Sequence, residues 1–130
     1  MIIKKIGNTI ISRGVIPESH EIATAHFFNE RGFDVEFLVP IDEKCVKTPD
    51  IKMNGFLWEI KSPKGKGKYT ITHAFKKAIK QSENIIFDLR RLNTFDCKAI
   101  TQLKKQFELI HKIKRLLIIT KSNKLLDFQK

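Results

Sequence analysis

The sequence predicts a mixed α/β fold in which helices flank a β-sheet. Asn54-Gly55 lies between two apolar segments and is typical of a two-residue hairpin turn, because both positions favour a positive φ. Beyond this hairpin, short apolar runs alternate with segments of helical periodicity, as they do in strand–helix–strand units. A length of 130 residues is typical of one domain, so we expect a single domain over residues 1–130.

Each element has a local signal. Gly7-Asn8 separates two short β-prone segments, which indicates a small N-terminal hairpin. Ser19 begins a helix, and Gly32 ends it. The later elements follow from alternation, helical spacing or short apolar runs. The predicted order after the N-terminal hairpin is α-β-β-β-α-β-α-β, with helices from 19 to the residues before 32, at 70–83 and at 96–112, strands at 35–39, 48–53, 56–62, 84–89 and 115–120, and a further strand at 125–128.

Each predicted helix carries one apolar stripe. Its apolar side chains recur three or four residues apart, so the stripe would face the sheet. Trp58 of the hairpin is expected in the core, because it points away from the face of Glu59. The stripe residues are Ile22, Ala25 and Phe28; Ile71, Ala74, Phe75, Ala78 and Ile79; and Ile100, Leu103, Phe107 and Ile110.

Positive charge is concentrated in the second half of the chain. The formal net charge is +11. Residues 1–60 hold 7 basic and 9 acidic residues, whereas residues 61–130 hold 18 basic and 5 acidic residues. A basic field of this size favours a polyanionic partner, nucleic acid first and an acidic protein or membrane second. A lysine-rich surface that serves only solubility is the alternative.

Composition excludes several classes of protein. No run of 18 apolar residues exists, so a membrane span is excluded, and residues 1–14 lack the apolar core of a signal peptide. Cys45 and Cys97 lie far apart without metal-ligand spacing, which argues against a disulfide scaffold and a cysteine zinc site. We therefore expect a cytoplasmic site of action, no membrane partner and no small-molecule cofactor.

The predicted hairpin brings charged side chains together. With a two-residue loop, Asp50 lies directly opposite Glu59, and Thr48 lies opposite Lys61. Side chains alternate along a strand, so Glu59 and Lys61 share a face. Carboxylates that lie opposite each other repel, and a divalent cation bound between them would remove this repulsion. The lysine beside such an ion would orient a water molecule or stabilise charge on a phosphate. Ordinary surface ion pairs on a solvent-exposed hairpin are the alternative.

The residue pattern resembles a nuclease signature. Thr48-Pro49-Asp50, then eight residues, then Glu59-Ile60-Lys61 resembles the PD-(D/E)XK motif, and the predicted order matches that superfamily's core over about residues 19–90. The resemblance implies a restriction-endonuclease-like fold and a metal-dependent nuclease, with Mg²⁺ or Mn²⁺ as cofactor and Zn²⁺ as the alternative. It also implies that Asp50, Glu59 and the backbone carbonyl of Ile60 bind the metal, and that Lys61 serves the attacking water.

That superfamily often adds an acidic residue from the first helix, and Glu21 is the match we expect. Glu21, Ala25 and Phe28 are spaced i, i+4 and i+7, so Glu21 lies along the inward stripe. The alternative is that Glu21 only interacts with the helix dipole, as acidic residues in a first turn do. Glu18 and His20 are close competitors.

A closer resemblance extends over most of the chain, to the CdiA-type tRNase toxin domains. These are C-terminal toxin domains of contact-dependent growth inhibition systems, built on the same nuclease fold. The similarity implies RNA cleavage, with tRNA as the favoured substrate, and an immunity protein that blocks the site. A DNA endonuclease with the same site and a non-catalytic nucleic-acid-binding module are the alternatives. The matching segments are 19–25, 32–35, 49–50, 58–63, 81–82 and 85–86.

Further residues are candidates for contacts with the substrate. Gln81 lies on the inward stripe of the second helix, where it would touch substrate or satisfy buried backbone groups. Lys64, Lys66 and Lys68 would hold phosphates without sequence preference, or form a solvated loop. His73 follows this loop and is a candidate too, although a lone histidine on a helix is more often structural or exposed.

Overall fold

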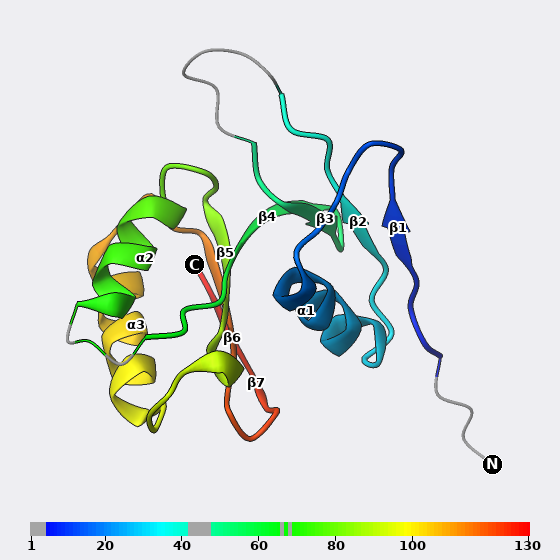
Figure 1. Cartoon of the computed structure of the whole chain (residues 1–130). Coiled ribbons are helices and arrows are strands. Elements are labelled where there is room, and N and C mark those ends of the chain that lie inside the picture. The colour runs from blue at the N-terminus through cyan, green and yellow to red at the C-terminus, as the bar shows by residue number, and fades with distance from the viewer. Residues whose placement is uncertain (1–4, 42–47, 66, 68) are drawn as a thin grey trace. The chain divides into compact units, whose positions relative to one another are not determined.

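The computed structural model describes residues 5–41, 48–65, 67 and 69–130 and has a mixed α/β fold (Figure 1). The elements are β1 (Thr9–Ile11), α1 (Ser19–Asn29), β2 (Val35–Phe37), β3 (Ile51–Met53), β4 (Phe56–Lys61), α2 (Thr70–Ala78), β5 (Asn84–Asp88), η1 (Leu89–Arg91), α3 (Cys97–Leu109), β6 (Arg115–Ile119) and β7 (Leu125–Gln129). The strand order is β1-β2-β3-β4-β5-β6-β7. β1 pairs in parallel with β2, and β5 pairs in parallel with β4 and β6, whereas the other pairs are antiparallel. The sheet is therefore mixed, as predicted.

The chain divides into two compact units, a first unit of Met1–Trp58 and a second unit of Glu59–Lys130. The boundary falls within β4, after Trp58. The single-domain organisation stays a prediction. No helix in the described ranges is both long enough and apolar enough to cross a membrane.

The β3–β4 hairpin of the first unit forms at the predicted turn. Asn54 and Gly55 have φ values of 53° and 83°, and Met53 pairs with Phe56 across them. Both turn residues therefore adopt the left-handed conformation that the Asn-Gly dipeptide favours. Trp58 is 3% exposed, and its indole N–H donates to the Met53 carbonyl at 3.0 Å, so its predicted place in the core is confirmed.

The predicted N-terminal hairpin includes residues 2–4, which lie outside the described residues. β1 pairs in parallel with β2, and residues 5–8 form no strand. The backbone N–H of Gly7 donates to the Asn29 carbonyl, and a Cβ at Gly7 would lie 1.9 Å from the carbonyl oxygen of Phe33. Gly7 is thus a position of close backbone approach to the end of α1, and not a turn. At the other end of the chain, β7 (Leu125–Gln129) lies where the further strand at 125–128 is predicted.

Gly7→Ala should destabilise the protein by about 3 kcal/mol, because the added methyl group forces backbone movement in a packed segment. Urea-induced unfolding measures the loss. Lys5→Ala, at an exposed neighbouring position, is the control and should change the free energy of unfolding by less than about 0.5 kcal/mol. Equal stability of the two variants would contradict the close approach.

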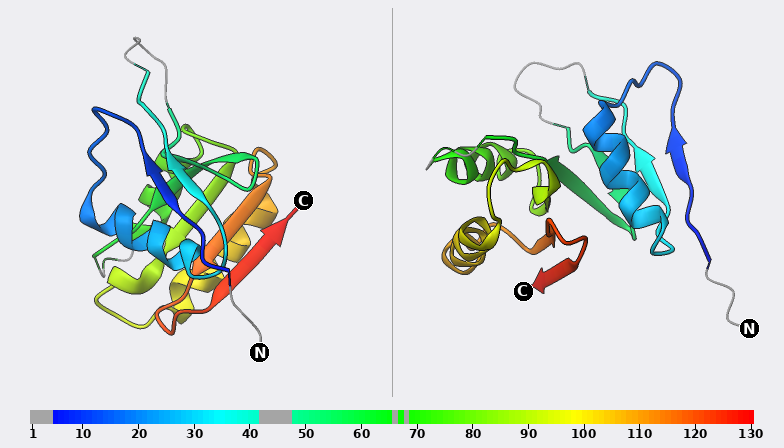
Figure 2. Two further views of the ribbon diagram at one scale, coloured as in Figure 1. Left: turned by 90° about the vertical axis from the view of Figure 1, so that its right-hand side faces the viewer. Right: turned by 60° about the horizontal axis from the view of Figure 1, so that its bottom comes forward.

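The second unit is built around the fully buried strand β5. α2 and α3 lie on one side of β5, β6 and β7 (Figures 1 and 2). The predicted inward stripes of both helices pack into this core. α2 ends at Ala78, before the predicted 83, because the chain turns there to enter β5. The buried members of the cluster are Ile71, Phe75, Ala78, Ile85, Phe87, Leu89, Leu92, Ala99, Leu103, Phe107, Ile113, Leu116 and Ile118.

Candidate functional site

Glu59 and Lys61 form an ion pair on the second half of β4. Lys61 Nζ lies 3.2 Å from Glu59 Oε2, so the two side chains share a face, as predicted. The Glu59 side chain is 4% exposed and that of Lys61 is 24% exposed. Burying a carboxylate is costly unless a partner compensates its charge, and Lys61 does so here. The residual exposure of Lys61 leaves it accessible to a second anion.

The paired strand β5 holds this ion pair in place. Glu59 pairs with Ile85 and Lys61 with Phe87, and both partners are fully buried. A charged pair on a central, well-packed strand has little freedom to reorient. Such rigid placement is what a catalytic or binding group requires.

A groove of about 390 Å³ opens beside Lys61 in the second unit. His73, a predicted substrate residue, lines it, and its ring stacks on Tyr69 with centroids 6.1 Å apart. Thr70 and Lys77, which are not among the residues predicted from the sequence, also line the groove. The spacing of Thr70, His73 and Lys77 at i, i+3 and i+7 on one helix face was the available signal. Two lysines and a histidine at one groove suit a phosphate.

Glu21 and Asp50 are close enough in the first unit to influence each other's charge. Burial raises the pKa of Glu21, the backbone N–H of Glu18 lowers it by donating to Glu21 Oε1 at 2.9 Å, and the Asp50 carboxylate raises it again. The bond from the Glu18 N–H to Glu21 stabilises the start of α1 as part of a capping box. The proximity of Glu21 to Asp50 is the feature that the site hypothesis requires.

The backbone around Asp50 differs from the predicted register. The ladder pairs Ile51 with Trp58, yet the N–H of Asp50 also donates to the Trp58 carbonyl, at 2.9 Å. Two successive residues lie against one, which is the arrangement of a β-bulge. β3 therefore begins after Asp50, and the expected direct pairing of Asp50 with Glu59 is not part of the ladder. Bulges often re-aim a side chain beside an active site.

The other candidate residues have varied surroundings. Ile60 is buried in β4 opposite Ile86, and its carbonyl as a metal ligand stays a prediction. Gln81 follows α2, and its Oε1 is buried without a hydrogen-bond partner among the described residues. Lys64 is exposed. Lys66 and Lys68 lie outside the described residues.

The carboxylates are the groups that could hold a metal. Among the described residues, no cluster of three or more histidine, cysteine, aspartate or glutamate side chains is assembled. Glu21 and Asp50 belong to the first unit, whereas Glu59 belongs to the second unit. Carboxylate oxygens are hard ligands of the type that Mg²⁺ and Mn²⁺ prefer.

Glu21→Gln should raise the free energy of unfolding at pH 7 and have a smaller effect at pH 4. The folded-state pKa of Glu21 lies above its ordinary value, so the wild-type protein loses stability as the pH rises from that ordinary value through the raised pKa. Glutamine avoids this loss and can still accept from the Glu18 N–H. Urea unfolding at both pH values measures the effect. Glu30→Gln, in an exposed pair with His26, is the control. Lower stability of Glu21→Gln at pH 7 would contradict the raised pKa.

Comparisons with known proteins gave a match to one protein family and to a solved structure. Residues 47–125 match the family described as the contact-dependent growth inhibition CdiA C-terminal domain. The fold resembles the CdiA-CT/CdiI toxin and immunity complex from Burkholderia pseudomallei, with a TM-score of 0.71 and 17% sequence identity, over 95% of this chain and 100% of that chain. At this identity the likeness shows a shared fold. No curated protein matches the sequence significantly.

Proposed function

Because this chain belongs to the CdiA C-terminal domain family of contact-dependent growth inhibition, we propose that it is a toxin domain that cleaves RNA. The proposed chemistry is metal-dependent hydrolysis of a phosphodiester bond by a site of the PD-(D/E)XK type. We propose tRNA as the substrate and the cytoplasm as the place of action. The family membership supports the toxin role, and the site residues support the chemistry.

The observation that carries this proposal is the Glu59–Lys61 ion pair. A carboxylate and an ammonium group two residues apart on a buried strand lose hydration on folding, which lowers stability. Stability alone therefore does not explain why the pair is there. The pair borders a groove that also presents His73 and Lys77. A nuclease needs this combination, because it must bind an anionic backbone and activate water beside it.

Each residue has a role in the proposed reaction. Lys61 orients the attacking water and stabilises the negative charge that builds on the phosphate. His73 and Lys77 hold the substrate backbone in the groove. The water oxygen bonds to phosphorus, the bond to the leaving sugar oxygen breaks, and that oxygen takes up a proton. Gln81 and Lys64 are proposed as further substrate contacts.

The proposed cofactor is a divalent cation bound by carboxylates. Burial is the main cause of the raised pKa of Glu21, and repulsion from the Asp50 carboxylate adds to it. A cation between acidic groups relieves such repulsion. Glu21, Asp50 and Glu59 would hold the ion, together with the Ile60 carbonyl. When bound, it supplies positive charge that polarises a phosphate and makes water more acidic. Mg²⁺ or Mn²⁺ is the proposed ion, with Zn²⁺ as the alternative.

Two other functions remain as outcomes of the test. A DNA endonuclease would use the same residues, and the basic second half of the chain would bind either polyanion. A non-catalytic nucleic-acid-binding module would need the positive charge but not the carboxylates.

The test incubates the purified protein with total tRNA or plasmid DNA, in Mg²⁺, Mn²⁺, Zn²⁺ or EDTA. We expect cleavage of tRNA that depends on metal and is lost in Asp50→Asn and Lys61→Ala. Asp127→Asn and Lys76→Ala, at exposed positions outside the site, are the matched controls and should remain active. Cleavage of DNA alone would favour the DNA endonuclease. Tight, salt-sensitive binding without cleavage would favour the binding module.

We also propose that an immunity protein neutralises this domain by covering the groove beside Lys61. The structurally similar protein from Burkholderia pseudomallei is described as a toxin and immunity complex, which supports such a partner. Coexpression of a candidate immunity gene should then protect Lys61 from amine-reactive labelling. Unchanged labelling in a stable complex would place the partner elsewhere.

A further inference from the structure

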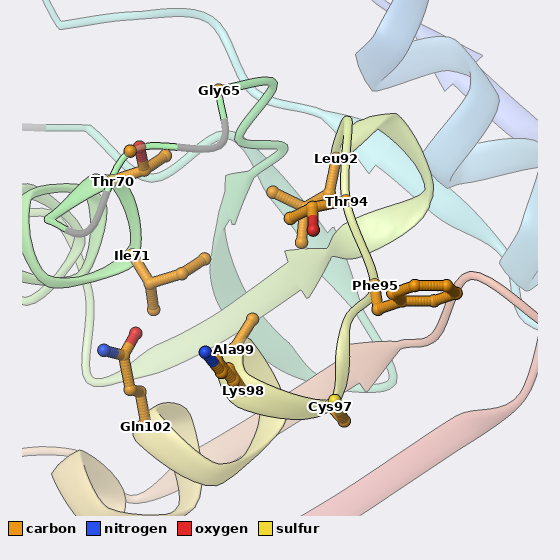
Figure 3. A pocket seen from close by; sticks show the side chains of 11 residues that line it. Gly65, Thr70, Ile71, Leu92, Thr94, Phe95, Cys97, Lys98, Ala99 and Gln102 are labelled. Atoms are coloured by element: carbon orange, nitrogen blue, oxygen red, sulfur yellow. The ribbon is translucent and has the colours of Figure 1, made fainter.

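A second pocket of the second unit lies between α2 and the segment that leads into α3 (Figure 3). Its volume of about 480 Å³ is in the range of small-molecule sites. The lining includes the apolar side chains of Ile71, Leu92 and Ala99, which are 5–6% exposed. Among the described residues, none of the site candidates predicted from the sequence lines this pocket. Its apolar lining suits a flat, uncharged ring.

The rim carries polar groups and an exposed aromatic ring. Lys98 and Gln102 are one turn apart on α3, and in Figure 3 the ends of both side chains lie on the side of Ile71. Phe95 is 87% exposed, and its ring projects outward from the rim. A cation can bind the phosphate of a nucleotide, an amide can bind the edge of its base, and an exposed aromatic ring can stack on the face of a base.

The pocket adjoins the groove beside Lys61. Thr70 lines both of them. Gly65 and Gly67 lie close to Thr70. A Cβ added at Gly65 would lie 3.1 Å from the Thr70 hydroxyl oxygen, and one added at Gly67 would lie 3.3 Å from it. A nucleic-acid strand with one phosphate beside Lys61 can therefore continue past Thr70 into the pocket.

We propose that this pocket binds the base of an unpaired nucleotide adjacent to the phosphate held beside Lys61. Lys98 contacts the phosphate of that nucleotide, Gln102 contacts the edge of its base, and Phe95 stacks on the neighbouring base. The inference rests on the proposed function of the groove. It also defines the class of substrate, since only a single-stranded or looped segment can place a base in the pocket.

Cys97 provides a direct test, because it is exposed and lines the same pocket. In a Cys45→Ser background Cys97 is the remaining thiol, and its alkylation by a maleimide can be followed by intact mass. In EDTA, a saturating single-stranded RNA oligonucleotide should slow alkylation at least fivefold. A fully paired RNA duplex of the same length should slow it less than twofold. Absence of protection, or equal protection by the duplex, would overturn the proposal.

Variants test the contacts without relying on catalysis. Phe95→Ala and Lys98→Ala should each weaken binding of the same oligonucleotide about tenfold, measured by fluorescence anisotropy in EDTA. Leu109→Ala and Lys105→Ala, exposed on α3 outside the pocket, should change the affinity less than about twofold. Unchanged affinity in both pocket variants would overturn the assignment. An inactive protein that still shows protection would instead disprove the nuclease proposal alone.

Discussion

Lys61→Met is expected to lower the free energy of unfolding by about 3 kcal/mol and to slow RNA cleavage strongly. The substitution leaves the Glu59 carboxylate, 4% exposed, without its lysine at 3.2 Å, and removing one partner of a buried ion pair is strongly destabilising. The proposed stabilisation of phosphate charge is lost as well, which corresponds to roughly a 10²–10³-fold decrease in rate. Urea unfolding and a tRNA cleavage assay measure the two effects.

A double variant separates these two effects. Glu59→Gln/Lys61→Met removes both charges, so we expect its stability to lie within about 1 kcal/mol of wild type, while its cleavage stays at least as slow as that of Lys61→Met. Lys76→Met removes an exposed lysine of α2 and should change neither property. Cleavage by the double variant at the wild-type rate would show that the ion pair is only structural.

Leu103→Ala is expected to cost about 3 kcal/mol of stability. Leu103 is fully buried between α3 and the sheet of the second unit, and truncation of such a side chain loses apolar burial and leaves a cavity. Leu109→Ala makes the same change on the same helix at a position that is 63% exposed, so it should cost less than about 0.5 kcal/mol.

The same variant tests the single-domain prediction. The fluorescence of Trp58 reports on the first unit, whereas Leu103 belongs to the second. If the chain unfolds as one domain, Leu103→Ala should shift the unfolding midpoints of tryptophan fluorescence and far-UV circular dichroism equally. A shift confined to circular dichroism would show that the two units unfold separately.

The elements that could be predicted are those with local causes. Asn54-Gly55 specifies its turn through the φ preferences of two adjacent residues. The apolar stripes of α2 and α3 can be recognised because the side chains that face inward recur every three or four residues along a helix. Glu59 and Lys61 share a face because they are two residues apart on one strand. None of these features depends on distant parts of the chain.

The features that were missed depend on contacts between distant segments. Gly7 was interpreted as a turn residue, but Phe33, far along the chain, is the reason for a glycine there. Ile22 was placed on the inward stripe of α1, yet it is 45% exposed, whereas Phe27 is buried. The bulge at Asp50 likewise adds a backbone bond that a regular hairpin register does not contain. Lys77 meets the groove beside Lys61 because α2 packs against β5, where Phe75 stacks on Phe87.

The parallel pairing of β5 has a consequence for the kinetics of folding. The β3–β4 and β6–β7 hairpins close over short turns and form on a timescale of about 1–10 μs. By contrast, Ile85 pairs with Leu116, 31 residues away, so β5 must overcome a larger loop-closure entropy before its contacts form. We expect β5 to insert late. Until then β5, which is buried along its whole length in the native protein, is exposed and can pair with other chains. Refolding at low protein concentration should therefore limit aggregation.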